Sequence, residues 1–352
     1  MEPRSASICQ VVLMDGTFAS LTEGQGSSIA RIHAMLSGGF GATPAPVQIH
    51  YAPGQQWAAW RTLPQLVSGH SLDHNIRAAY GWLARHWRPG NPLYLFGYSR
   101  GGIGVSALAD MIDRIGLLRP EHASEGNIAM AWDCWRNRSG APPGADLCHD
   151  RVPIRMVGLL DTVMSLGVRL PFLWTVSEPD FDYAKGRLAA NVERGAHALA
   201  LDETREAFAP ILWTGARGDD VEQMWFRGCH ADIGGQLGGC EYARPLANLP
   251  LVWLMSCAEE TGLPLPEGWR RHHPCDHQAP QLGSWHSWGK AFLRRRARQV
   301  GHDLSERMHP SVPRPYDGPA SLTGGLSATA APRRMRLRLP RGGGAEDGSA
   351  PA

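Results

Sequence analysis

Short apolar runs alternate with longer amphipathic stretches along this chain, and this alternation predicts its secondary structure. Four runs have the length and composition of buried strands: residues 8–14, 47–51, 93–96 and 154–160. Residues 221–227 alternate apolar and polar positions as a half-buried strand does, and the short run 210–213 is a further candidate strand. Strands separated by helical segments are typical of an α/β fold with a mostly parallel sheet flanked by helices.

Apolar residues spaced by three and four positions predict the helices between these strands. The pattern is clearest in residues 73–87, and it also predicts helices at 27–36, 103–118, 186–203, 246–262 and 285–300. Residues 119–150 are instead rich in Pro, Gly and polar side chains, although they contain Trp132 and Trp135. We expect this segment to be a lid-like insertion over the functional site rather than part of the core.

The first candidate for chemistry follows the strand at 93–96. There the sequence Gly97-Tyr98-Ser99-Arg100-Gly101 precedes a predicted helix. A G-x-S-x-G nucleophile elbow needs this context, because its glycines let the backbone turn tightly and its serine is exposed at the strand tip. Ser99 is therefore the candidate nucleophile. The alternative is a glycine-rich turn that only packs or binds a phosphate at the helix amino end.

Two further residues of catalytic type also end predicted strands. Asp161 directly follows the strand at 154–160, and His230 follows the strand at 221–227. Because the carboxyl ends of parallel strands share one edge of a sheet, Ser99, Asp161 and His230 are expected to meet there. Their order along the chain is that of the α/β-hydrolases, with histidine as general base and aspartate as its orienting partner. Asp232 is expected to bond the backbone N–H groups of its own turn, with pairing to His230 or a cation as alternatives.

The first strand ends in the turn Asp15-Gly16-Thr17 at the same predicted edge. A backbone N–H from Gly16 or Thr17, together with that of Arg100, is expected to form an oxyanion hole. In this interpretation Asp15 supports the turn. An ordinary Asp-Gly turn without a catalytic role remains an equal alternative.

Composition narrows the classes of partner. The chain has 352 residues, 43% of them hydrophobic, and its 35 basic side chains nearly balance its 33 acidic ones, so a nucleic-acid partner is not expected. Seven irregularly spaced cysteines indicate reduced thiols rather than a disulfide framework. Neither a signal peptide nor a spanning segment is recognisable. We expect a cytoplasmic protein, with export without a cleaved signal as the alternative.

Several stretches allow more than one interpretation. Residues 270–277 contain three histidines and a cysteine, but not at a zinc-binding spacing, so we expect no metal or other cofactor. The basic cluster at 294–298 is interpreted as the solvated face of a helix, with contact to anionic lipid headgroups as the alternative. The apolar run at 164–174 lies either in the core or in an acyl pocket. We expect one domain over residues 1–312 and a low-complexity, largely disordered tail over 313–352, with residues 342–352 disordered.

Several of these residues stand in blocks that resemble an α/β-hydrolase family whose best-known members are phospholipase effectors of the bacterial type VI secretion system. The blocks are residues 15–17 (its opening Asp-Gly-Thr motif), 97–101 (its G-[FY]-S-R-G elbow), 160–163 (its W-D-T-V segment, with Leu160 in place of tryptophan) and 225–235 (its W-F-x-G-x-H-x-D-[VI]-G-G block). The resemblance implies Ser99, Asp161 and His230 as the triad. The region after residue 300 has no counterpart in it.

These observations together predict a serine hydrolase that cleaves carboxylic esters, with acyl or lipid esters as the preferred substrates of a phospholipase, lipase or esterase. Longer acyl chains should be preferred, because each buried methylene is worth about 0.8 kcal/mol. An acyltransferase with the same triad is one alternative. A toxin-type effector with an immunity protein or a secretion-system component as partner is another, and peripheral contact with a membrane is a further expectation.

Overall fold

The computed structural model describes residues 7–55, 70–137, 143–163, 186–215, 220–286, 289–290 and 292–323. Within these ranges a seven-stranded sheet has the order β2-β1-β3-β4-β5-β6-β8, and every neighbouring pair is parallel. Its strands are β1 (Cys9–Met14), β2 (Val47–Ala52), β3 (Leu93–Tyr98), β4 (Met156–Leu160), β5 (Gly195–Ala200), β6 (Val221–Phe226) and β8 (Glu306–Met308). The parallel sheet brings all the strands' carboxyl ends to one edge. This architecture confirms the predicted α/β class.

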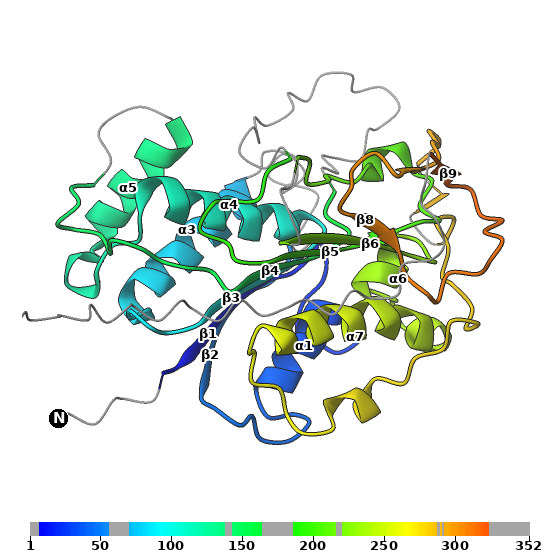
Figure 1. Cartoon of the computed structure of the whole chain (residues 1–352), viewed down its shortest axis with the longest axis horizontal. Helices are drawn as coiled ribbons and strands as arrows, with labels where there is room; N and C mark the ends of the chain where they lie inside the picture. The colour runs from blue at the N-terminus through cyan, green and yellow to red at the C-terminus, as the bar shows by residue number, and fades with distance from the viewer. Residues whose placement is uncertain are drawn as a thin grey trace, which may run out of the picture.

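Helices cover both faces of the sheet (Figure 1). On one face lie α3 (His70–His86), α4 (Arg100–Ile115) and α5 (Glu125–Asn137), and on the other lie α1 (Ser28–Leu36) and α7 (Arg244–Glu260). Both faces of β1 are buried, which explains its apolar sequence. Val12 and Met14 pack into one helical layer, and Val11 and Leu13 pack into the other. A strand buried on both faces has no solvent side on which polar residues would alternate.

The segment 119–150 differs from the lid-like covering that its composition suggested. It contains α5, which packs on α3 and α4 as part of the helical layer. Ile128, Trp132 and Trp135 lie at helical spacing and are buried in the same cluster as those helices. The indole of Trp135 also donates a hydrogen bond of 2.8 Å to Asp110. This apolar stripe within a polar segment gives the helix a face to bury, so the two tryptophans are core residues.

The predicted helix at 186–203 is wrong, because this stretch contains strand β5. Ala196, Ala198 and Ala200 point into the cluster on the α1–α7 face, whereas Leu199 lies in a separate cluster with Trp225. Alanine favours helices in isolation, but pairing with β4 and β6 on both sides overrides that preference. The candidate strand at 210–213 does not join the sheet; its Ile211 N–H bonds the Thr162 carbonyl at 2.9 Å.

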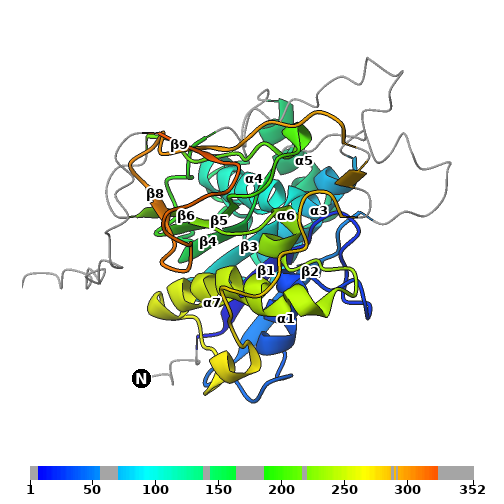
Figure 2. The ribbon, with the colours of Figure 1, turned by 90° about the vertical axis from the view of Figure 1, so that its right-hand side faces the viewer.

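The predicted helix at 285–300 is also wrong. Its end forms β7 (Gln299–Val300), which pairs in parallel with β9 (Ser321–Leu322) in a small separate sheet. Arg298 and Val300 are buried while Gln299 is exposed, which is the alternation of an extended chain. Figure 2 shows this carboxyl-terminal segment, with β8 and β9, on the side of the molecule near β6.

Residues 313–323 differ from the prediction of a largely disordered tail. They include β9, and the hydroxyl of Tyr316 donates to Asp202 at 2.7 Å. The rest of the predicted tail and the apolar run at 164–174 lie outside the described residues. The domain boundary at residue 312 stays a prediction.

All seven cysteines lie in the described ranges and none is in a disulfide, which confirms the expectation of free thiols. Among the helices that the structure describes, none combines the length and apolarity that crossing a bilayer requires.

Candidate active site

A sharp turn between β3 and α4 carries Ser99 at the carboxyl edge of the sheet. Ser99 has φ 54° and ψ −123°, a conformation that residues with a side chain rarely adopt. A Cβ added to Gly97 would lie 2.5 Å from the Gly101 carbonyl oxygen, and one added to Gly101 would collide with the Met14 carbonyl. Gly97 is therefore needed for the turn to close on the start of α4, and Gly101 for the turn to pack against β1. This strained strand–turn–helix is the geometry of a nucleophile elbow.

The imidazole of His230 lies between Ser99 and Asp161. His230 is the first residue of α6 (His230–Gly234), which follows β6 after a short turn. Its Nε2 lies 3.0 Å from Ser99 Oγ, and its Nδ1 lies 2.7 Å from Asp161 Oδ2. The structure thus brings together the three residues predicted to be catalytic, from the ends of β3, β4 and β6. Their hydrogen-bonded chain has the connectivity of a Ser-His-Asp triad.

Aromatic and charged neighbours hold the His230 ring. The ring centroids of Tyr98 and Phe208 lie 4.9 and 4.8 Å from that of the imidazole. The backbone N–H of His230 donates to Glu203 at 3.2 Å, and Glu203 is itself paired with Arg205 at 2.6 Å. Burial raises the pKa of Glu203, but the hydrogen bonds and charge of Arg205 outweigh burial and lower it. These contacts fix the ring's position from both sides.

Asp161 is fully buried and accepts four hydrogen bonds. Besides His230, the donors are the Ala200 backbone N–H and both terminal nitrogens of Arg298, each at 3.0 Å. Burial by itself raises the pKa of the Asp161 carboxyl. The charge of Arg298 and the bond from His230 reverse this effect and hold the pKa well below its usual range. The carboxylate is therefore ionised at neutral pH.

The loop after β1 touches the nucleophile. A Cβ added to Gly16 would lie 3.2 Å from Ser99 Cβ. The Gly16 N–H is already engaged by the Asp15 carboxylate at 2.8 Å, whereas within the described part of the chain the Thr17 N–H has no hydrogen-bond partner. The Thr17 hydroxyl accepts a bond of 2.7 Å from Arg100 Nε. Of the two predicted oxyanion donors on this loop, Thr17 thus fits that role better than Gly16.

Asp15 ties this loop to its surroundings. Its carboxylate accepts from the Ser27 hydroxyl at 2.7 Å and from the Tyr51 hydroxyl at 3.0 Å, in addition to Gly16. Burial raises the pKa of Asp15 to about 6, and the three hydrogen bonds only partly offset it. The loop's position therefore depends on a carboxyl that binds a proton more readily than an exposed aspartate.

Asp232 binds backbone groups rather than the imidazole. Its two oxygens accept from Cys229 N at 2.9 Å and from Leu282 N at 2.8 Å. The first bond closes the turn before His230, and the second attaches the segment around residue 282 to that turn. Asp232 therefore stabilises the loop that presents the histidine.

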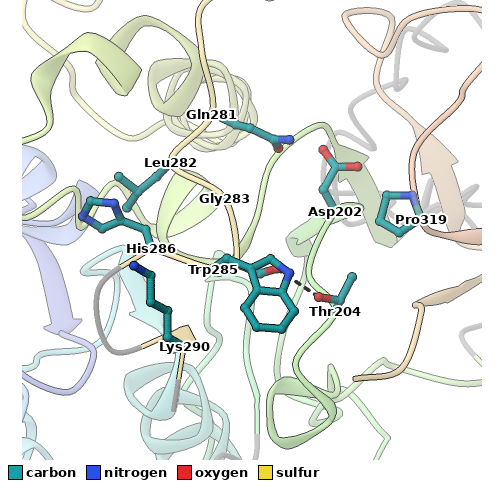
Figure 3. Close-up of a pocket in the computed structure, with 10 residues that line it drawn as sticks. Asp202, Thr204, Gln281, Leu282, Gly283, Trp285, His286, Lys290 and Pro319 are labelled. Carbon is teal, nitrogen blue, oxygen red and sulfur yellow. Dashed lines mark hydrogen bonds between the residues drawn. The ribbon is translucent and has the colours of Figure 1, made fainter. Parts of the chain in front are cut away.

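Two cavities adjoin these residues. One of about 600 Å³ lies beside the His230 turn and is lined by Asp202, Thr204, Trp285 and Lys290 among others (Figure 3). Thr204 and Ser284 hydrogen-bond each other in its wall at 2.9 Å. A smaller cavity of about 30 Å³ is bordered by Thr17 and Arg100. It has room for about one water molecule beside the candidate oxyanion donors.

The histidine-rich loop at 270–277 has a packing role in the structure. The ring of His272 stacks on Phe40 at 4.9 Å, and the buried His273 lies against Phe40 and Trp269. Among the described residues no group of three histidines, cysteines, aspartates or glutamates is placed to hold a metal ion.

A family model for the type VI secretion system phospholipase effector Tle1-like catalytic domain matches residues 10–257, well over half of the chain. The chain belongs to this family. Membership confirms the resemblance seen in the sequence blocks and the predicted enzyme class, a serine hydrolase acting on esters. The match runs from β1 to α7 and includes Ser99, Asp161 and His230.

The chain is also similar to individual proteins. It shares 29% identity over 159 residues with an uncharacterised protein of Saccharomyces cerevisiae, covering 41% of this chain and 22% of that protein. A solved structure of an uncharacterised protein from Pseudomonas aeruginosa has 17% identity and a TM-score of 0.48, over 75% of this chain and 47% of the other. The chain thus spans about a fifth of the curated relative and about half of this structure.

Two further solved structures are similar. Esterase 2 of Thermogutta terrifontis matches with 14% identity and a TM-score of 0.40, over 74% of this chain and 87% of the esterase. A Tle1 effector bound to the VgrG spike of a type VI secretion system matches with 16% identity and a TM-score of 0.38, over 66% of this chain and 51% of the effector chain.

Sequence reasoning missed Arg298 as a residue of the site. It was grouped with the exposed basic residues of a predicted helix, yet it is 4% exposed and binds Asp161 through both terminal nitrogens. One signal for it was present: Val300 is apolar and Gln299 is polar, so a strand pattern would place Arg298 on the inward face beside Val300.

Proposed function

We propose that this chain hydrolyses carboxylic esters of lipid acyl chains, with Ser99 as nucleophile, His230 as general base and Asp161 as the orienting carboxylate. The observation that carries the proposal is the continuous hydrogen-bonded chain from Ser99 Oγ through both nitrogens of His230 to Asp161. It is set at an elbow whose serine has a positive φ. Family membership supports the same chemistry.

In this mechanism Ser99 Oγ attacks the ester carbonyl as its proton passes to His230 Nε2. The bond from Nδ1 to Asp161 keeps the imidazole in the tautomer whose Nε2 can accept that proton. The tetrahedral intermediate then collapses, and His230 returns the proton to the leaving alcohol. Water, activated by the same imidazole, attacks the acyl-enzyme and releases the carboxylic acid.

The negative charge on the carbonyl oxygen needs hydrogen-bond donors that are already in place. The backbone N–H of Arg100 follows the nucleophile at the start of α4, and that of Thr17 lies on the loop beside Ser99. The loss of one such donor costs about 3 kcal/mol of transition-state stabilisation in other hydrolases. We assign the oxyanion hole to these two groups.

Apolar surface near the site supports an acyl substrate. Phe18 and Leu21 are 42% and 46% exposed on the loop that carries Thr17. Exposed large apolar side chains next to a catalytic loop suit contact with an acyl chain or a lipid surface. Trp132 and Trp135 of α5 lie in the core and do not contribute to this apolar surface.

Labelling with a fluorophosphonate probe tests the nucleophile. The wild-type protein should be labelled, Ser99→Ala should not, and Ser106→Ala should be labelled like the wild type. Ser106 is a suitable control because it lies on α4 near the elbow, where its hydroxyl bonds the Gly102 carbonyl at 2.9 Å. Equal labelling of wild type and Ser99→Ala would overturn the assignment.

The reaction class needs a separate measurement, because an acyltransferase would use the same triad. With a labelled ester and increasing concentrations of an alcohol, a hydrolase releases mainly free acid, whereas a transferase diverts the acyl group to the alcohol. A dominant ester product at low alcohol concentration would contradict hydrolysis.

The family description also favours a secretion-system context for the chain. We infer that its partner is a component of a type VI secretion system, in keeping with the similar Tle1 effector solved with a VgrG spike. Co-purification of the chain with such a spike protein, compared with an unrelated protein of similar size, tests this inference. Equal recovery with both proteins would refute it.

A further inference from the structure

We propose that Arg298 is a positioning residue for the triad: from outside the family match, it grips both oxygens of Asp161 and so fixes the carboxylate that orients His230. The family model ends at residue 257, and Arg298 lies on the carboxyl-terminal segment beyond it. The inference rests on the proposed serine-hydrolase mechanism and deepens it.

The contact has the geometry of a strong ion pair. Nη1 of Arg298 bonds Oδ1 of Asp161 and Nη2 bonds Oδ2, both at 3.0 Å, so the planar guanidinium meets the carboxylate as a fork. The side chains are 3% and 0% exposed. Water therefore screens the pair little. A further bond of 2.7 Å from Nη2 to the Phe208 carbonyl holds the fork in place.

The hydrogen bonds of Asp161 hold its carboxylate in a single orientation. Oδ1 accepts from Ala200 N and Arg298, and Oδ2 accepts from His230 Nδ1 and Arg298. Rotating the carboxylate would break several of these bonds together in a fully buried site, where each unmade bond is costly. Without Arg298, each oxygen would keep a single partner and the orientation would be less strictly determined.

The backbone of Arg298 and of the residues that follow it is anchored. Its carbonyl accepts from Ser321 N at 2.8 Å, and the next pair of the small sheet is closed by Thr323 N bonding the Val300 carbonyl at 2.8 Å. Val300 is fully buried beside Trp225 of β6. The β7–β9 sheet thus holds the arginine against the domain, and a segment outside the region matched by the family model completes the candidate site.

The charged and titratable groups around the pair come from several elements. They are His230 of α6, Tyr98 of β3, His197 of β5 and the Glu203–Arg205 pair that follows β5. Burial lowers the pKa of His197 to about 4, and its Nε2 accepts from Thr162 N at 3.1 Å, so it is neutral. His197 therefore does not supply a replacement cation. Removal of the Arg298 charge favours proton binding by the Asp161–His230 pair.

The test measures kcat and kcat/KM for a soluble ester across pH in three variants: Arg298→Gln, Arg298→Lys and the control Arg296→Gln. Arg296 is exposed and lies two residues earlier on the same segment. Arg298→Gln should lower kcat by about 10- to 100-fold, the range for hydrogen bonds lost to a charged group. The acidic limb of its profile of kcat/KM against pH should also move to higher pH. Arg298→Lys keeps the charge but not the fork, so it should lower kcat while leaving the limb near its wild-type position.

Thermal unfolding separates positioning from packing. If Arg298→Gln does not fold, Arg298→Lys decides the question, and the double variant Asp161→Asn with Arg298→Gln should recover stability by removing both charges. Folded Arg298 variants with wild-type kcat and pH profile would overturn the positioning role, even if they melt earlier. A wild-type protein without Ser99-dependent turnover would overturn the proposed function and this inference together.

Discussion

Replacement of Asp161 by asparagine tests the site most directly, because the change is nearly isosteric. The carboxylate accepts bonds on both oxygens, and the amide that replaces it has one oxygen and one N–H₂ group. Whichever way the amide points, its nitrogen meets the donor Arg298 and either His230 or Ala200. If the amide nitrogen faces His230, Nδ1 must accept its hydrogen bond and the imidazole proton must lie on Nε2. A protonated Nε2 cannot accept the proton of Ser99.

Two losses follow from this geometry. Turnover should fall by about 10⁴-fold, as it does when the triad aspartate of a serine protease is replaced by asparagine, which is equivalent to about 5 kcal/mol of transition-state stabilisation. The guanidinium of Arg298 also loses its counter-ion in a fully buried site. Breaking such a pair costs about 3–5 kcal/mol. Because the asparagine oxygen still accepts a bond, we expect a stability loss at or below the lower end of that range.

Asp232→Asn is the matched control, since Asp232 is equally buried but binds the backbone N–H groups of Cys229 and Leu282 rather than the imidazole. Release of p-nitrophenol from a butyrate ester measures turnover, and urea unfolding measures stability. Asp161→Asn should lose far more activity than Asp232→Asn. If both variants fold and Asp232→Asn is the slower enzyme, or if Asp161→Asn stays within tenfold of wild type, the orienting role of Asp161 is wrong.

Two other predictions follow from the site. For p-nitrophenyl esters, kcat/KM should rise from acetate to octanoate, because each methylene buried near Phe18 and Leu21 adds about 0.8 kcal/mol; a flat or falling series would remove lipid esters from the proposal. Burial raises the pKa of Asp15 to about 6 in the folded protein, whereas the unfolded chain releases the same proton near pH 4. The contribution of Asp15 to the free energy of unfolding therefore falls as pH rises from about 4 to 6. Compared with Asp15→Asn, the wild type should lose up to about 2–3 kcal/mol of unfolding free energy over that interval, and parallel pH profiles for the two proteins would contradict this pKa.

The sequence alone was sufficient for the features that short stretches encode. The buried runs of β1, β3 and β4 are continuous, so each is recognisable without its neighbours. The elbow around Ser99 is recognisable because only glycine fits at Gly97 and Gly101. Asp161 and His230 could be predicted because each lies just beyond the carboxyl end of a strand, and a parallel sheet gathers such positions at one edge.

Only the tertiary structure decided the features that depend on distant partners. The alanine-rich β5 is a strand because β4 and β6 pair with it on both sides, and nothing within the segment itself outweighs alanine's preference for helix. Gly16 and Thr17 could be distinguished only once Asp15 was seen to engage the Gly16 N–H. Arg298 lies 137 positions from Asp161, and a charged side chain can be buried only where a partner compensates it. That partner is identified by the fold and not by any local pattern, which is why the arginine looked like an ordinary surface residue in the sequence.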